Sequence, residues 1–361
     1  MADDPVRPDV PRRGRPGATL AAVAARVGVS RTTVSNAYNR PDQLSADLRD
    51  RVLAAAVELG YPGPDPVARS LRTRQADAVG LIFAERLEYA FHDPGAVEYV
   101  GGLASACTER GRSLLMVPAG RDHLETVQRA AVDGFVVSAL SAADELLAAV
   151  LARPQPAVIV DTPLGLPGVD FVGIDDRAGC ALIGAHVAGL GHRRIGVVAV
   201  RRDEDVPAEP KPSPLADRVA AGAVRHPVRQ LRLLGLRDTL PAGARVLVTE
   251  RVANSREEGA LGAAALLGAA PDLTAVLCLS DILALGVLDE LQARGRPGVT
   301  VTGFDDVPAA AGAGLTTVRQ PLAGKGRAAI ELLLDDRPRA TAVQRLLPCE
   351  LVVRGSSGPP G

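Results

Sequence analysis

The sequence predicts a small, all-helical N-terminal domain followed by a large α/β body with two doubly wound parallel sheets. Two patterns lead to this expectation. Between Leu20 and Leu59 the apolar residues recur every three or four positions, as on one face of a helix. From Ala78 onward, short β-like apolar runs alternate with Ala- and Leu-rich helical stretches, which is typical of parallel sheets with helices on both faces. The 361 residues, 47 % of them hydrophobic, are sufficient for more than one domain.

The first 17 residues are expected to form a disordered arm, because they hold four prolines and four arginines with no apolar period. They also lack the apolar stretch of a secretory signal, and no uncharged apolar run in the chain reaches the 18 residues of a membrane span. The four cysteines are far apart, without metal-ligand or CxxC spacing. These features predict a cytoplasmic protein with reduced cysteines and no metal or cofactor.

Residues 18–64 are predicted to form a helix-turn-helix headpiece of three helices. Gly28 permits a sharp bend between the first two helices, and Ser30 can cap the second. A third helix can start after Ser45 and end at Gly60. The apolar residues that the first two helices would bury are Leu20, Val23, Ala24, Val27, Val34 and Ala37.

The second of these helices carries short polar side chains on its outer face, of the kind that read base edges or hold phosphates. They are Arg31, Thr32, Ser35 and Asn36. Six arginines and no acidic residue lie between Val10 and Pro41, and residues 1–75 carry a net charge of +4 against −5 for the remainder. This arrangement favours a helix that enters the major groove of DNA. The alternative is an ordinary helical hairpin whose polar face is only solvated.

The stretch resembles the headpiece of the lactose/galactose repressor (LacI/GalR) family of bacterial transcription factors. The matching positions are Thr19-Leu20, Val23-Ala24, Gly28-Val29-Ser30, Thr33-Val34-Ser35 and Asn39. Asn36 stands where the family frequently has arginine. The resemblance implies that Thr19, Ser30, Thr33 and Asn39 join the DNA contacts.

Residues 65–76 are predicted to be a hinge helix and linker. The run from Pro66 to Arg72 suits a short helix, but one too short to be stable alone. Its VARSLR sequence resembles the family's hinge helix, which implies that it orders on the operator with Ala68 and Leu71 at the minor groove. Leu71 would wedge between bases. The alternative is an interdomain linker that happens to be helical.

Residues 77–355 are predicted to form a two-lobed domain for effector binding and dimerisation. The expected strands are 78–83, 113–117, 134–137, 157–160, 170–173, 195–200, 245–248, 275–279 and 299–303. The resemblance continues through 58–62, 189–195, 303–306, 315–321 and 348–354, and it implies a periplasmic-binding-protein-like body with three crossings between lobes. We expect these crossings near Pro163, Arg296 and Gln320. Lobe 1 would then comprise 77–162 and 297–318, and lobe 2 163–296 and 319–355.

Residues 202–227 differ from the family, which usually has a short loop at this place. The segment contains five prolines and many charged residues. It is therefore expected to be a mobile surface loop.

The candidate effector site begins just after the first expected strand, where Tyr89, Phe91 and Asp93 lie close together. An aromatic ring beside acids can hold a sugar or a nucleobase. Tyr99 fits either this site or packing between subdomains.

By resemblance, the contacts also include Asp161, Arg232 and Asp305. Ser280 stands where the family frequently has a residue with an amide side chain. Asn254 stands where the family frequently has an aromatic residue that stacks on the ligand. Asp281 is either a contact or an acid favoured by its helix dipole.

These patterns predict a regulator, in this family usually a repressor, that binds near-palindromic operator DNA as a homodimer and responds to a small molecule, expected to be a sugar. One alternative is an enzyme on a doubly wound fold, but the sequence has no GxGxxG fingerprint, P-loop, GxSxG elbow or His/Cys metal cluster. The other is the solute-binding protein of a transporter, which the DNA-reading headpiece argues against.

Overall fold

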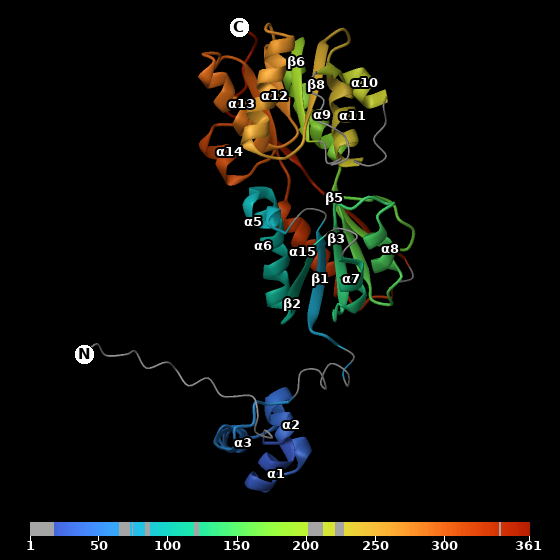
Figure 1. Ribbon diagram of the computed structural model, residues 1–361, viewed down its shortest axis with the longest axis vertical. Coiled ribbons are helices and arrows are strands. Elements are labelled where there is room, and N and C mark those ends of the chain that lie inside the picture. Colours follow the sequence, from blue (N-terminus) through green and yellow to red (C-terminus); the bar gives the residue numbers. More distant parts are fainter. Residues whose placement is uncertain are drawn as a thin grey trace, which may run out of the picture. The chain divides into compact units, whose positions relative to one another are not determined.

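The computed structural model describes residues 18–64, 73, 75–83, 87–118, 123–200, 212–220, 227–338 and 341–361. The chain divides after Gln75 into two compact units, an N-terminal headpiece and a larger body. Figure 1 labels the α-helices of both units and some of the strands of the body. The predicted arm, residues 1–17, and the hinge run from Pro66 to Arg72 lie outside the described residues.

The headpiece contains three helices around one small core. They are α1 (Leu20–Val27), α2 (Arg31–Asn39) and α3 (Ala46–Leu59), with a 3-10 turn, η1 (Pro41–Gln43), before α3. Hydroxyl groups cap all three, since Thr19, Ser30 and Ser45 accept hydrogen bonds from the first turns. Gly28 and Gly60 end α1 and α3 in the left-handed conformation, at φ 75° and 70°. The core consists of Val23, Ala24, Val34, Ala37, Val52, Ala55 and Ala56, which confirms the predicted helix-turn-helix.

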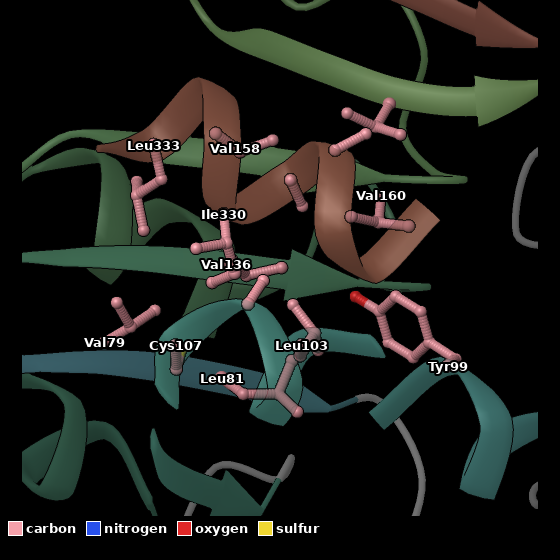
Figure 2. Close-up of a cluster of buried hydrophobic side chains, with 14 of the residues drawn as sticks. Val79, Leu81, Tyr99, Leu103, Cys107, Val136, Val158, Val160, Ile330 and Leu333 are labelled. Carbon is pink, nitrogen blue, oxygen red and sulfur yellow. The ribbon is translucent and has the colours of Figure 1, made fainter. Parts of the chain in front are cut away.

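The first sheet of the body is parallel throughout, in the order β12-β5-β4-β3-β1-β2. Its strands are β1 (Ala78–Phe83), β2 (Ser113–Pro118), β3 (Gly134–Ser138), β4 (Ala157–Val160), β5 (Asp170–Ile174) and β12 (Gln344–Leu347). Its helices are α5 (Tyr89–His92), α6 (Pro94–Glu109), α7 (Leu124–Arg129), α8 (Glu145–Leu151) and α15 (Leu322–Leu333). α6 and α15 cover one face, where Leu103 and Ile330 meet Val136 and Val158 of the strands (Figure 2). α7 and α8 cover the other face.

The second sheet has the order β13-β11-β10-β9-β6-β8-β7 and is parallel except at its two edge strands. The strands are β6 (Arg194–Val200), β7 (Ser213–Pro214), β8 (Arg245–Arg251), β9 (Ala275–Cys278), β10 (Thr300–Asp305), β11 (Thr316–Arg319) and β13 (Glu350–Val352). The helices are α9 (Asp176–Gly189), α10 (Leu215–Ala220), α11 (Pro227–Thr239), α12 (Arg256–Ala269), α13 (Asp281–Ala293) and α14 (Pro308–Gly312). α9 and α11 pack on one face and α12 and α13 on the other. The two doubly wound sheets confirm the predicted fold class.

The chain crosses between the sheets after β5, after β11 and after β12. A crossing does lie at Gln320, but those expected near Pro163 and Arg296 are wrong. β5 follows Pro163 yet pairs with β4 of the first sheet, and β10 follows Arg296 yet pairs with β9 of the second. The predicted lobe boundaries are wrong for the same reason. Residues 297–318 belong to the second lobe, and α15 and β12 to the first.

The sequence predicted one mobile loop over residues 202–227. This prediction is wrong for residues 212–220, the part in the middle that the structure describes. β7 pairs antiparallel with β8, and α10 follows directly. Leu215 of α10 is only 5 % exposed and belongs to the core around α9 and α11. One buried apolar side chain thus anchors a stretch whose composition suggests a loop.

The helix pair α12 and α13 crosses at unusually short distance because glycines line the contact. A Cβ atom added to Gly286 would lie 1.9 Å from the carbonyl oxygen of Arg256, and one added to Gly259 would lie 2.2 Å from that of Leu283. The pair α6 and α15 crosses similarly, with Gly102 against the carbonyl oxygen of Ala323. At these places only glycine lets the backbones approach so closely.

The described helices include none that is long and apolar enough to cross a lipid bilayer.

Candidate functional site

A cavity of about 230 Å³ is lined by residues of both lobes of the body. It lies at the carboxyl ends of the parallel strands, where ligands of doubly wound folds bind. The first lobe contributes Phe83, Tyr89, Asp93, Gly95, Ala96, Tyr99, Ser138, Ala139, Asp161, Thr162, Leu322 and Lys325. The second contributes Val200, Pro227, Val228, Arg229, Arg232, Asn254, Leu279, Ser280 and Asp305, and Gln320 lies at the crossing.

Seven of the nine effector contacts expected from the sequence line this cavity: Tyr89, Asp93, Asp161, Arg232, Asn254, Ser280 and Asp305. Phe91 does not; its side chain on the short helix α5 is 63 % exposed. Asp281 does not either, because it is fully buried in the first turn of α13.

Asp281 connects three elements of the second lobe. Its Oδ1 accepts a hydrogen bond from the Thr317 hydroxyl at 2.5 Å, and its Oδ2 accepts one from the Val307 amide at 2.9 Å. Burial raises the pKa of Asp281 to about 6, although the Thr317 bond opposes the shift. The geometry therefore favours a structural role for this acid at its helix terminus.

Arg232 is held rigidly at the cavity wall. Its Nε donates to Asp176 Oδ1 at 2.7 Å, and its Nη1 donates to the carbonyl oxygen of Leu279 at 2.6 Å. The guanidinium also lies over the Phe304 ring, 3.7 Å from its centroid. Since arginine carries five N–H donors, these bonds orient the group and leave further donors for a ligand.

Asp305 ends β10 with a backbone φ of 122°, a conformation that non-glycine residues rarely adopt and that is concentrated at functional sites. Its Oδ1 accepts a hydrogen bond from Gln320 Nε2 at 2.5 Å. Burial raises the pKa of Asp305 to about 8, more than the charge of Arg232 lowers it. The shift favours the protonated carboxyl group, which can both donate and accept hydrogen bonds.

Asn254 connects the two lobes across the cavity. Its Nδ2 donates to the Tyr89 hydroxyl at 3.1 Å and to Asp93 Oδ2 at 2.8 Å. The Ser280 hydroxyl orients it by donating to Asn254 Oδ1 at 2.5 Å. Asp93 is itself fixed, because its Oδ1 caps α6 through the Ala96 amide.

Sequence reasoning missed five polar residues of the cavity: Ser138, Thr162, Arg229, Gln320 and Lys325. Lys325 is only 2 % exposed and donates from Nζ to Asp161 Oδ1 at 2.6 Å. Gln320 Oε1 is buried and has no hydrogen-bond partner within the described part of the chain. Tyr99, left open between site and packing, does both, since it lines the cavity and shares a 2.5 Å hydrogen bond with Ser138.

No group of three or more His, Cys, Asp or Glu side chains that could hold a metal ion occurs among the described residues.

In the headpiece, the predicted DNA contacts divide into two groups. Arg31 and Thr32 are exposed, and Asn36 is half-buried beside them on α2. The others that the structure describes mostly hold helix ends: Thr19 and Ser30 are N-caps, Thr33 bonds to Ser30, and Asn39 donates to the Ser35 carbonyl and hydroxyl oxygens. Ala68 and Leu71 lie outside the described residues.

The headpiece and the body each match a known protein family. The family described as "Bacterial regulatory proteins, lacI family" matches residues 19–63, and the "Periplasmic binding protein-like domain" matches residues 185–357. An HTH-type transcriptional regulator of Mycolicibacterium smegmatis is 45 % identical over 99 % of this chain and 100 % of its own length. The chain belongs to the LacI family.

Solved structures of the LacI family share the arrangement. A LacI-family regulator from Corynebacterium glutamicum has a TM-score of 0.69 at 33 % identity, covering 93 % of this chain and 98 % of that one. The regulator CelR in complex with cellobiose has a TM-score of 0.66 at 29 % identity, covering 94 % and 100 %. This LacI-family protein is thus a DNA-binding transcriptional regulator and not an enzyme.

Proposed function

We propose that this regulator represses transcription as a homodimer on a near-palindromic operator, and that an uncharged sugar or related polyol in the cavity controls its operator affinity. The observation that carries the proposal is the cavity itself. Both lobes line it with hydrogen-bonding groups, so one ligand can contact both and change how they close.

The chemistry of the cavity suits a sugar. The Phe83 and Tyr89 rings lie 6.4 Å apart with an interplanar angle of 28° and offer apolar faces for C–H groups. The carboxyl group of Asp305 and the unpartnered oxygen of Gln320 can bind hydroxyl groups. The complex of CelR with cellobiose, a disaccharide, supports the same class of effector.

The headpiece supplies the DNA contacts in this proposal. Arg31, Thr32 and Asn36 read the major groove, while the capping residues of α1 and α2 position the backbone on the phosphates. Ala68 and Leu71 bind the minor groove from the hinge. One helix-turn-helix reads only a few base pairs, and two-fold symmetry doubles the site.

The test combines a thermal-shift screen with operator binding. We expect a sugar or polyol to raise the melting temperature of the full chain and to change its affinity for a near-palindromic duplex selected from a random library. Light scattering should give a dimer on that duplex. If only nucleosides or amino acids stabilised the protein, the effector class would be wrong, and a strict monomer on DNA would refute the homodimer.

Thr32→Ala and Asn36→Ala should each relax base preference at one operator position by about 1–3 kcal/mol, because each removes a hydrogen-bonding group from the outer face of α2. The measurement is competitive binding of operator variants that differ by one base pair. Asp50→Ala is the control, since Asp50 is exposed on α3 and should leave the preference unchanged. Equal losses for operator and unrelated DNA would show that these side chains bind the backbone instead.

A further inference from the structure

Lys325 and Asp161 form an ion pair of the first lobe, and both of its members belong to the cavity wall. Lys325 Nζ donates to Asp161 Oδ1 at 2.6 Å, and both residues line the cavity. In the pair of Arg232 and Asp176, by contrast, the arginine lines the cavity and the acid does not. A ligand can therefore contact the ammonium group and the carboxylate of the first pair together.

The position of Lys325 is unfavourable for a cation. It is the fourth residue of α15, near the positive end of the helix dipole, and its side chain is buried. A buried ammonium group beside one carboxylate is well stabilised only when its other N–H groups also find acceptors. Residues that break local rules in this way are expected at functional sites.

Neither member of the pair uses all of its hydrogen-bonding capacity within the described part of the chain. Lys325 Nζ carries three N–H groups and donates there to one acceptor, Asp161 Oδ1. Asp161 Oδ2 accepts from no donor among the described residues, and the side chain of Asp161 is 29 % exposed. Donors of the ammonium group and an acceptor of the carboxylate thus remain for a ligand in the cavity.

The choice of lysine at this place is unusual for the chain. Its 41 lysine and arginine residues include two lysines, Lys211 and Lys325, of which Lys211 lies outside the described residues. A guanidinium group is planar and directs five donors along fixed lines, whereas an ammonium group is compact and can turn its three donors. Lysine therefore suits a small space in which one donor must hold a carboxylate and the others must meet a ligand.

We propose that Lys325 and Asp161 together bind two hydroxyl groups on adjacent carbon atoms of the effector. The ammonium group donates to the oxygen of one hydroxyl group, and Asp161 Oδ2 accepts a hydrogen bond from the other. Adjacent hydroxyl groups present a donor and an acceptor side by side, which matches the two members of one ion pair. This inference rests on the proposed sugar effector and specifies the pattern of hydroxyl groups that Lys325 selects.

The pair discriminates against charged groups in the same place. A carboxylate or phosphate group offers acceptors to Lys325 but brings its negative charge close to that of Asp161. An amine offers donors to Asp161 but brings its positive charge close to that of Lys325. Either group would lose its hydration and meet a like charge, which is unfavourable in a site that excludes water.

The test is Lys325→Met in the full chain, with calorimetric titration of glucose, ribose, cellobiose and sorbitol. Methionine keeps most of the length of the side chain and removes the ammonium group. We expect at least one of these compounds to bind the wild type saturably. Lys325→Met should bind that compound about tenfold or more weakly, because a hydrogen bond from a charged donor is lost.

Monodeoxy analogues of the compound that binds separate a ligand contact from a structural role. Two analogues, each lacking one hydroxyl group of an adjacent pair, should bind the wild type more weakly. The analogue that lacks the hydroxyl group bound by Lys325 should lose affinity for the wild type and almost none for Lys325→Met. If every analogue lost the same affinity for both proteins, Lys325 would not contact a hydroxyl group.

Arg327→Met is the matched control on α15. Arg327 also forms an ion pair, since its Nη1 lies 2.6 Å from Glu109 Oε2, but neither residue lines the cavity. The substitution changes the net charge as Lys325→Met does and should leave the affinity for the sugar unchanged. An equal loss of affinity would show that net charge alone is responsible.

Lysine labelled with ¹³C at Cε gives a measurement on the wild type, which is valid even if Lys325→Met does not fold. Because the sequence has two lysines, two NMR signals are expected, and Lys211→Arg assigns them by removing one. The bound compound should shift the Lys325 signal. If saturation left this signal unchanged, the inference would be wrong.

The outcomes separate this inference from the proposed function. If no compound of the set binds the wild type, the proposed sugar effector fails and the diol site fails with it. If one compound binds the wild type and a folded Lys325→Met equally tightly, the sugar effector stands and the diol site is refuted.

Discussion

Arg232→Ala should bind the operator as the wild type does and no longer respond to the effector. The side chain belongs to the cavity wall, and its bonds to Asp176 and Leu279 lie within the second lobe. Its loss therefore removes a ligand donor without changing the headpiece. Allosteric coupling of about 1–3 kcal/mol corresponds to a change of about 5- to 150-fold in operator affinity, and this change should disappear. Fluorescence anisotropy with and without the sugar identified by the screen measures it.

Asp305 provides a companion test, because its side chain is expected to act as a neutral acid near pH 7. Asp305→Ala should lose the response, whereas Asp305→Asn keeps a neutral donor and acceptor and should retain most of it. Arg237→Ala is the control on α11, since Arg237 pairs with its neighbour Asp238 outside the cavity. A full response by Arg232→Ala would mean that this arginine does not contact the ligand. Loss of operator binding without ligand would indicate a structural role.

Gly286→Ala should lower the free energy of unfolding of the body by about 3 kcal/mol. The new methyl group would lie 1.9 Å from the carbonyl oxygen of Arg256, so one of the two helix backbones must move. A side chain could rotate away, but a helix backbone packed on the sheet cannot. Differential scanning calorimetry of the full chain should show a lower transition temperature for the body.

Gly268→Ala is the matched control on α12. A Cβ atom at Gly268 would meet nothing within 4 Å, and alanine favours helix by about 0.5–1 kcal/mol over glycine. This variant should be as stable as the wild type or more so. If the two variants had the same stability, the close crossing of α12 and α13 would be refuted.

The local pattern of the sequence was sufficient to predict most of the helices and strands. It was not sufficient to assign them to the two lobes. The capped helices of the headpiece and the buried strands from β1 to β6 have strong periodic or apolar patterns, and they lie within a few residues of their expected ranges. β7, β11, β12 and β13 were missed, because each has two to four residues that include polar or charged ones, whereas the equally short β4 and β9 are apolar runs. Lobe membership depends on which strands pair, and pairing over long distances leaves no local pattern.

The residues of the candidate site also include some that the local sequence pattern could predict and others that it could not. Tyr89 and Asp93 follow an evident strand, so their place near the cavity could be predicted. Lys325 lies inside a helix and reaches Asp161 across 164 residues of sequence, and no spacing indicates that contact. Asp281 has an acidic side chain, which could bind a ligand. The residues that bind it instead, Thr317 and Val307, come from other elements and could not be found from its local sequence.

The order of the crossings has a consequence for synthesis on the ribosome. The first lobe begins at β1, but its core is completed by α15 and its sheet edge by β12, after almost the whole second lobe. The headpiece, in contrast, closes its core with residues 20–61 alone. A nascent chain therefore completes the headpiece first and cannot complete the first lobe until Leu347 has emerged. A truncation between Tyr61 and Leu347 leaves the complete headpiece core attached to a body whose first sheet lacks its final strand.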